Sequence, residues 1–96
     1  MLNQQQINTI INTLKPFNPK KIGIFGSFAR GENSEHSDID ILYRFENVIG
    51  LFSLMNLKED LERKLNKKVD LVSEKYIHPK LAPYIVNDLK IIYEQD

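Results

Sequence analysis

The sequence predicts an α+β fold, in which helices pack against a small mixed β-sheet. Two observations predict it. Isoleucine and leucine recur at helical spacing in separate segments, and short apolar or alternating runs typical of strands lie between those segments. The chain has 96 residues, of which 42% are hydrophobic and 27% charged, so we expect one folded domain over residues 1–96.

The first predicted helix lies near the N-terminus. Asn3 can cap its start, and Pro16 cannot continue it. Its apolar side chains fall on one helical face, and they are Ile7, Ile10, Ile11 and Leu14. This face predicts a helix that packs on the core.

A buried strand and a turn are predicted next. Residues 22–25, Ile-Gly-Ile-Phe, form a short apolar run that ends abruptly at Gly26 and Ser27. Residues 28–37 are polar, which predicts a loop with a helical turn at its start.

Residues 38–45 alternate between apolar and other side chains, which predicts a second strand. Asp38 and Asp40 fall on one face near its beginning. The opposite face is a natural core face, formed by Ile39, Ile41, Tyr43 and Phe45.

The rest of the chain predicts four more elements. Leucine spacing predicts a packing helix over residues 50–66, to which we assign no chemistry. Residues 67–73 predict a strand that turns Asp70 away from its apolar neighbours. A helical segment is expected over residues 79–87, followed by a short strand over residues 90–93.

Composition excludes several kinds of protein. Thirteen basic residues balance thirteen acidic ones, so no basic face for nucleic acid is indicated and nucleic-acid binding is the weakest hypothesis. The absence of cysteine excludes disulfides and thiolate chemistry. The start of the chain does not resemble a signal peptide, and no apolar run is long enough to span a membrane. We therefore expect a cytoplasmic protein with no membrane partner.

The turn after the first strand has the features of a phosphate site. Gly26 lets an anion approach the backbone, and Ser27 adds a hydroxyl donor. Arg30, one helical turn further on, offers a fork of N–H donors. A glycine–serine turn alone is common, so it has an ordinary structural explanation as well.

The acidic residues indicate a metal site. Asp38 and Asp40 lie about 7 Å apart along one strand face, and carboxylates so placed repel each other unless a cation lies between them. Magnesium prefers carboxylate and phosphate oxygens. Asp70 would join this cluster if its strand lies beside that of Asp40, and the three acids could then hold two metal ions. Otherwise each acid is an exposed strand residue.

Taken together, these residues resemble a known family. Gly26 and Ser27 are followed by ten residues, 28–37, and then by Asp38-Ile39-Asp40. This pattern, with Ala29, Arg30 and Gly31, resembles the minimal nucleotidyltransferase (MNT) family of the polymerase-beta-like nucleotidyltransferase superfamily.

The resemblance implies a role for each residue of the motif. Gly26 and Ser27 match the triphosphate-binding turn, and Asp38 and Asp40 match two metal-binding acids. Asp70 is the best match for the third acid of the family, which lies on a later strand. Glu74 is a weaker candidate because it follows that strand. The implied cofactor is Mg²⁺, with two ions expected and Mn²⁺ possible, and the implied nucleotide is ATP.

The resemblance also implies a biological role. Many minimal members resemble antitoxins of HEPN–MNT toxin–antitoxin pairs, which transfer AMP from ATP to a tyrosine hydroxyl of the HEPN toxin. A HEPN toxin is therefore the expected partner. Two alternatives stay open at this stage: nucleotidyl transfer to a hydroxyl of a small molecule, and an antitoxin that acts by stoichiometric binding without catalysis.

Overall fold

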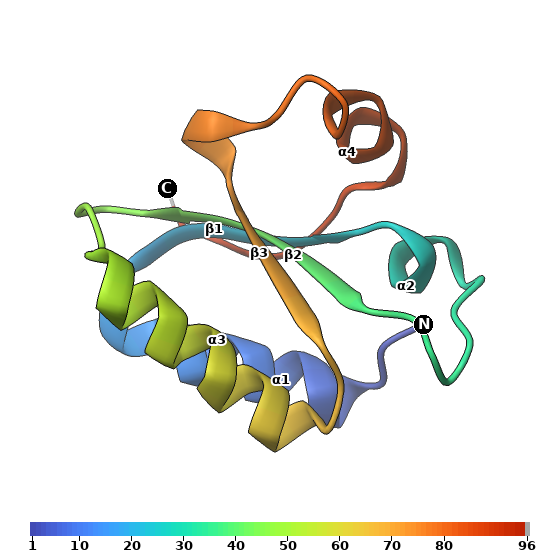
Figure 1. Cartoon of the computed structure of the whole chain (residues 1–96), viewed down its shortest axis with the longest axis horizontal. Coiled ribbons are helices and arrows are strands. Elements are labelled where there is room, and N and C mark those ends of the chain that lie inside the picture. The colour runs from blue at the N-terminus through green and yellow to red at the C-terminus, as the bar shows by residue number, and fades with distance from the viewer. Residues whose placement is uncertain (96) are drawn as a thin grey trace.

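The computed structural model describes residues 1–95 and contains a four-stranded sheet with helices on both faces (Figure 1). The strand order is β3-β2-β1-β4. β1 (Pro19–Phe25) pairs antiparallel with β2 (Ile39–Phe45) and with β4 (Lys90–Glu94). β2 pairs in parallel with β3 (Val69–Ser73), which forms one edge. The predicted mixed sheet is therefore confirmed.

The helices divide between the two faces of this sheet (Figure 1). α1 (Gln4–Leu14) and α3 (Leu51–Leu65) lie against one face and contact each other. α4 (Ala82–Asp88) covers part of the other face, and α2 (Ser27–Arg30) is a single turn at the end of β1. Two 3-10 turns complete the chain, η1 (Lys15–Phe17) and η2 (Glu74–Tyr76).

The start of α1 is fixed by local hydrogen bonds. The side chain of Asn3 accepts a bond of 2.8 Å from the Gln6 backbone N–H. The Gln6 side chain accepts one of 2.9 Å from the Asn3 N–H. This reciprocal pair satisfies two N–H groups that have no partner within the helix. The predicted cap is confirmed, and the chain leaves the α-helix at Lys15, just before Pro16.

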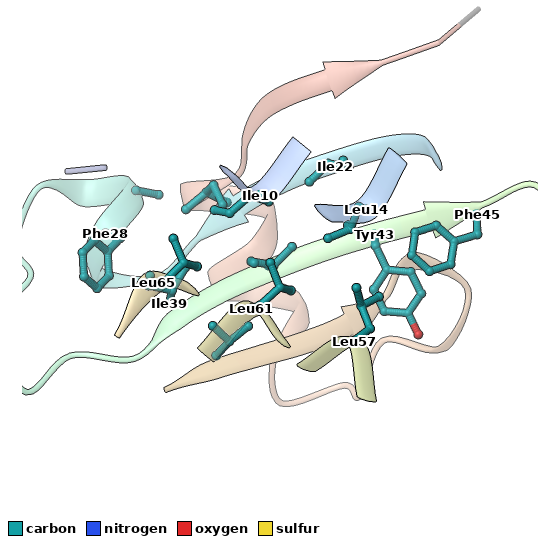
Figure 2. Close-up of a cluster of buried hydrophobic side chains, with 14 residues drawn as sticks. Ile10, Leu14, Ile22, Phe28, Ile39, Tyr43, Phe45, Leu57, Leu61 and Leu65 are labelled. Carbon is teal, nitrogen blue, oxygen red and sulfur yellow. The ribbon is translucent and has the colours of Figure 1, made fainter. Parts of the chain in front are cut away.

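Most of the apolar core lies between the sheet and the α1–α3 pair (Figure 2). Alternation along β2 sends one set of side chains into this core, as predicted. The labelled core residues are Ile10, Leu14, Ile22, Phe28, Ile39, Tyr43, Phe45, Leu57, Leu61 and Leu65. A second, smaller cluster lies under α4 and is centred on Phe25, Leu42 and Ile85. The α4 face of the sheet is thus only partly covered by apolar packing.

Some element boundaries differ from the prediction. β1 begins at Pro19 rather than at Ile22, because a proline is tolerated as the first residue of a strand. α4 begins at Ala82, since Pro83 fits the first turn of a helix, where its missing N–H costs nothing. Within residues 1–95, no helix combines the length and the apolar character that crossing a membrane requires.

Truncating Leu61 should test the core beneath the sheet. Leu61 is fully buried, so Leu61→Ala is expected to lower the free energy of unfolding by about 2–5 kcal/mol through lost burial and a residual cavity. Leu51, on the same helix, is 69% exposed, and Leu51→Ala should change the free energy of unfolding by less than about 0.5 kcal/mol. Urea unfolding followed by circular dichroism measures both, and equal losses would contradict this packing.

Candidate functional site

The register between β2 and β3 brings two acids together. Asp40 and Asp70 are direct partners in this parallel pair, so their side chains leave the same face of the sheet. Their carboxyl groups lie within hydrogen-bonding reach of each other. A hydrogen bond between two carboxyl groups requires a proton on one of them. The predicted adjacency of Asp70 to Asp40 is thus present in the structure.

This arrangement alters the proton affinity of Asp40. Burial beside the apolar cluster under α4, followed by the charge and the hydrogen bond of Asp70, raises the pKa of Asp40 from its ordinary 3.8 to about 6. The charge of Asp38 adds to this rise, and Arg30 opposes it weakly. Without a cation, Asp40 therefore keeps its proton up to about pH 6 and is increasingly ionised above that pH.

The predicted phosphate turn packs directly against Asp40. Gly26 has φ +75° and ψ −155°, a conformation that is essentially confined to glycine. A Cβ atom at this position would collide with the Asp40 carboxylate. Gly26 is therefore required both by the backbone and by the space that Asp40 occupies. The sequence predicted that Gly26 lets an anion approach, but it did not reveal this contact with Asp40.

α2 begins immediately after this glycine. The backbone N–H groups of Ala29 and Arg30 donate to the Gly26 carbonyl oxygen at 3.0 and 3.1 Å, which closes the turn. The N–H groups of Ser27 and Phe28 belong to the first turn, where no carbonyl within the helix can accept from them. Ser27 therefore follows directly on the glycine that packs against Asp40.

The guanidinium group of Arg30 forms ion pairs with two carboxylates. Its Nη1 donates to Asp88 at 2.5 Å and its Nε to Glu32 at 3.3 Å. Asp88 lies at the end of α4, so this ion pair joins two elements that flank the site. Binding of a phosphate by Arg30 stays a prediction, and it would require an exchange of these partners. Nothing in the sequence indicated Asp88, because 58 positions separate the two residues.

Asp38 is close enough for its charge to act on Asp40, but it does not line the hollow beside the acid pair. It is exposed, precedes β2 and lines a separate hollow of about 330 Å³ together with Lys67 and Lys68. Within residues 1–95, no three acidic or histidine side chains lie close enough to hold a metal ion by themselves. Magnesium usually takes one or two carboxylates and completes its shell with water and substrate phosphate oxygens. Asp40 and Asp70 fit that kind of site.

A hollow of about 340 Å³ opens beside the acid pair, near the lower limit for ligand sites. Three of its lining residues come from α3. The sequence analysis assigned no chemistry to this helix and therefore did not predict that it borders the site. Met55 and Lys58 are exposed at the margin of the leucine face. The lining residues are Phe25, Asp40, Leu54, Met55, Lys58, Asp70, Leu71, Val72 and Leu81.

The weaker candidate residues lie elsewhere. Glu74 begins η2 and pairs with Lys21 at 2.8 Å and with Arg44 at 3.7 Å. This places it toward the opposite end of β2 from Asp40. His36 is exposed in the loop before β2, and its imidazole lies 3.7 Å from the exposed carboxylate of Glu35.

Comparison with known proteins gives a consistent picture. A family model described as "Polymerase beta, Nucleotidyltransferase" matches residues 6–96, which include every strand of the sheet. The chain is 35% identical over 94 residues to the protein adenylyltransferase MntA of Thermococcus cleftensis, covering 93% of this chain and 95% of that protein. It is 44% identical over 79 residues to a Methanocaldococcus jannaschii protein provisionally named protein adenylyltransferase MJ0435, covering 82% and 85%.

A solved structure matches the three-dimensional fold. A crystal structure of a toxin–antitoxin with AMP-PNP has a TM-score of 0.82 and 26% identity, covering 94% of this chain and 74% of that chain. The predicted polymerase-beta-like nucleotidyltransferase fold is confirmed by these similarities and by the sheet itself.

Replacing Asp40 by Asn should stabilise the chain at pH 8 in EDTA. Because the pKa of Asp40 is raised to about 6, the folded state binds its proton more tightly than the unfolded state does. The proton on Asp40 therefore stabilises the folded state fully below about pH 4, and this stabilisation is lost as the pH rises through about 6. The advantage of Asp40→Asn should therefore grow by about 1–3 kcal/mol between pH 4 and pH 8.

Urea unfolding at several pH values measures this difference. Glu59→Gln, on the exposed surface of α3, is the control and should show no such growth. A difference between Asp40→Asn and wild type that does not vary with pH would contradict the raised pKa.

Replacing Gly26 by Ala should lower the thermal stability. The variant forces a side chain into a glycine-only conformation, at a cost of about 1–3 kcal/mol, and pushes it toward Asp40. Gly50 is the matched control, since its φ is −69° and no atom lies within 4 Å of the place that an added methyl group would take. Gly50→Ala should stay within about 0.5 kcal/mol of wild type. If calorimetry shows the same loss for both, Gly26 has no special role.

Proposed function

The chain belongs to the polymerase beta nucleotidyltransferase family, and from this premise we propose that it transfers AMP from ATP to a hydroxyl group of a partner protein. One observation carries the proposal: the Asp40–Asp70 pair lies directly beside the Gly26–Ser27 turn. A phosphate-binding turn and a carboxylate pair are the two parts that a metal-dependent phosphoryl-group transfer requires.

The order of the parts across the sheet suggests where each substrate lies. The Gly26–Ser27 turn follows β1, Asp40 lies on β2, and Asp70 lies on the edge strand β3. We infer that the triphosphate lies on the turn, next to Asp40. The acceptor hydroxyl then approaches from the β3 side, next to Asp70, which is the more exposed of the two acids.

A divalent cation fits the two carboxylates. Burial and mutual repulsion make ionisation of both unfavourable, and this is the condition that a bound cation relieves. Asp40 and Asp70 would hold it, with Asp38 as a third candidate ligand nearby. When bound, Mg²⁺ or Mn²⁺ would neutralise charge on the triphosphate and favour ionisation of the attacking hydroxyl.

The reaction balances without a covalent enzyme intermediate. The acceptor oxygen forms a bond to the α-phosphorus, and the bond from that phosphorus to the bridging oxygen breaks, which releases pyrophosphate. We propose that Asp70 accepts the hydroxyl proton. The backbone and hydroxyl donors at Ser27 orient the phosphates. Lys58, in the wall of the same hollow, adds positive charge close to the acids.

We propose a HEPN-type toxin as the partner, with a tyrosine as the acceptor. The relatives named as protein adenylyltransferases support a protein acceptor, and the similar chain in a toxin–antitoxin structure with AMP-PNP supports both the nucleotide and the setting. The motif over residues 26–41 adds to this, because it resembles the minimal nucleotidyltransferases of HEPN–MNT pairs.

Label transfer tests this function. Purified protein, Mg²⁺ and α-phosphate-labelled ATP are added to lysate of the source cells, and proteins are resolved on a gel. Wild type should label a protein band, whereas Asp40→Asn and Asp70→Asn should each lower the initial rate by at least about 100-fold, because each removes a charge needed at the reacting phosphate.

Glu74→Gln is the matched control and should keep most of the activity, because Glu74 lies outside the acid pair. Omission of the divalent cation should abolish labelling. Label that appears only in small molecules would instead support transfer to a small hydroxyl compound. An antitoxin that still neutralises its toxin with both acids replaced would act by binding alone, and either outcome would overturn the proposal.

A further inference from the structure

An exposed apolar surface lies on and beside the first half of α3. Its members are all large apolar or aromatic side chains that are at least half exposed in the structure. We call this surface the α3 patch, formed by Val48, Leu51, Phe52, Met55 and Tyr76. Single exposed apolar residues are ordinary, but several on neighbouring segments indicate an interaction site.

The α3 patch is continuous with the hollow that contains the acid pair. Val48 and Tyr76 line a second hollow, of about 230 Å³. Met55 lines the hollow of about 340 Å³ that also contains Asp70. Leu54 lines both hollows and so joins them. The two hollows therefore meet at Leu54, and the first of them extends around the edge strand β3 to the acids on the other face of the sheet.

The charged side chains that line the two hollows are basic apart from the acid pair, and one of them, Arg44, is paired with Glu74. Lys58 lines the hollow at the acid pair, and Arg44 and Lys75 line the second hollow. Asp40 and Asp70 supply the negative charge in the wall of the hollow of about 340 Å³. A partner with apolar side chains and acidic groups around them would complement this surface.

We propose that the α3 patch is the docking surface for the protein that carries the acceptor hydroxyl. The inference rests on the proposed function, in which the nucleotide occupies the Gly26 side of Asp40. The acceptor must then arrive over β3, and α3 is the helix that borders the hollow there. A protein whose hydroxyl reaches Asp70 from this direction covers the α3 patch.

A paired substitution separates docking from catalysis. Leu51→Ser/Phe52→Ser removes two apolar side chains that line neither hollow and contact neither acid. The probe is the protein that wild type labels in the lysate, purified and titrated in the label-transfer assay. The KM for this acceptor should rise about 30-fold, as expected on loss of an interface hot spot. The KM for ATP and kcat at saturating acceptor should stay within about twofold.

Val86→Ser is the matched control. Val86 on α4 is 82% exposed and Phe52 is 81% exposed, so each change removes an equally exposed apolar side chain. Val86→Ser should leave all three constants within about twofold of wild type. Thermal unfolding of all variants should coincide with wild type, because none of these side chains is buried.

The outcomes distinguish the two proposals. An unchanged acceptor KM in the double variant, while wild type labels its partner, overturns the docking surface alone. If the KM for ATP rises as much as the KM for the acceptor, the double variant has a distorted active site, and this result also overturns the docking surface. If sedimentation shows that the double variant only dissociates a self-dimer, the α3 patch joins two copies of this chain instead. If wild type labels no protein, the proposed function fails first and the docking surface fails with it.

Discussion

The site depends on one constraint, the parallel pairing of β2 with β3 in a register that sets Asp40 opposite Asp70. Two carboxyl groups on the same sheet face repel each other, and partial burial makes the charge on Asp40 still less favourable. Below about pH 6, a proton on Asp40 relieves this repulsion. At higher pH, a cation bound by the two carboxylates would relieve it instead, so cation binding would stabilise the ionised pair.

One face of the sheet carries most of the apolar core, and the other face carries the candidate site. The α1–α3 pair packs a continuous apolar core on one face and contributes most of the burial (Figure 2). The other face is covered only by the small cluster under α4, which leaves Asp40 at its margin. The opposite face carries Gly26, in a conformation essentially confined to glycine, and an unfavourable acid pair.

The sequence predicted those features that depend on near neighbours in the chain. The apolar face of α1, its Asn3 cap and the alternation of β2 each follow from spacing within a few residues. The link between Asp40 and Asp70 required knowing which strands pair, and no local pattern specifies this. The contact of Gly26 with the Asp40 carboxyl, the ion pair of Arg30 with a residue on α4 and the place of Lys58 in the wall of the hollow are likewise contacts between distant segments. They arise only after the chain has folded.

The ionisation of Asp40 is the property that most directly tests whether the acid pair is the centre of the site. Carbon-13 NMR of the side-chain carboxyl groups can follow Asp40 from pH 3 to pH 9, with Asp40→Asn used to assign its signal. We expect a titration near pH 6 in the free protein, where burial and Asp70 raise the pKa. We also expect Mg²⁺ with a non-hydrolysable ATP analogue to shift this titration well below pH 5. A titration near pH 4 in the free protein, or one that Mg²⁺ and nucleotide leave unchanged, would contradict the assignment of Asp40 and Asp70 as the centre that holds the cation and the nucleotide.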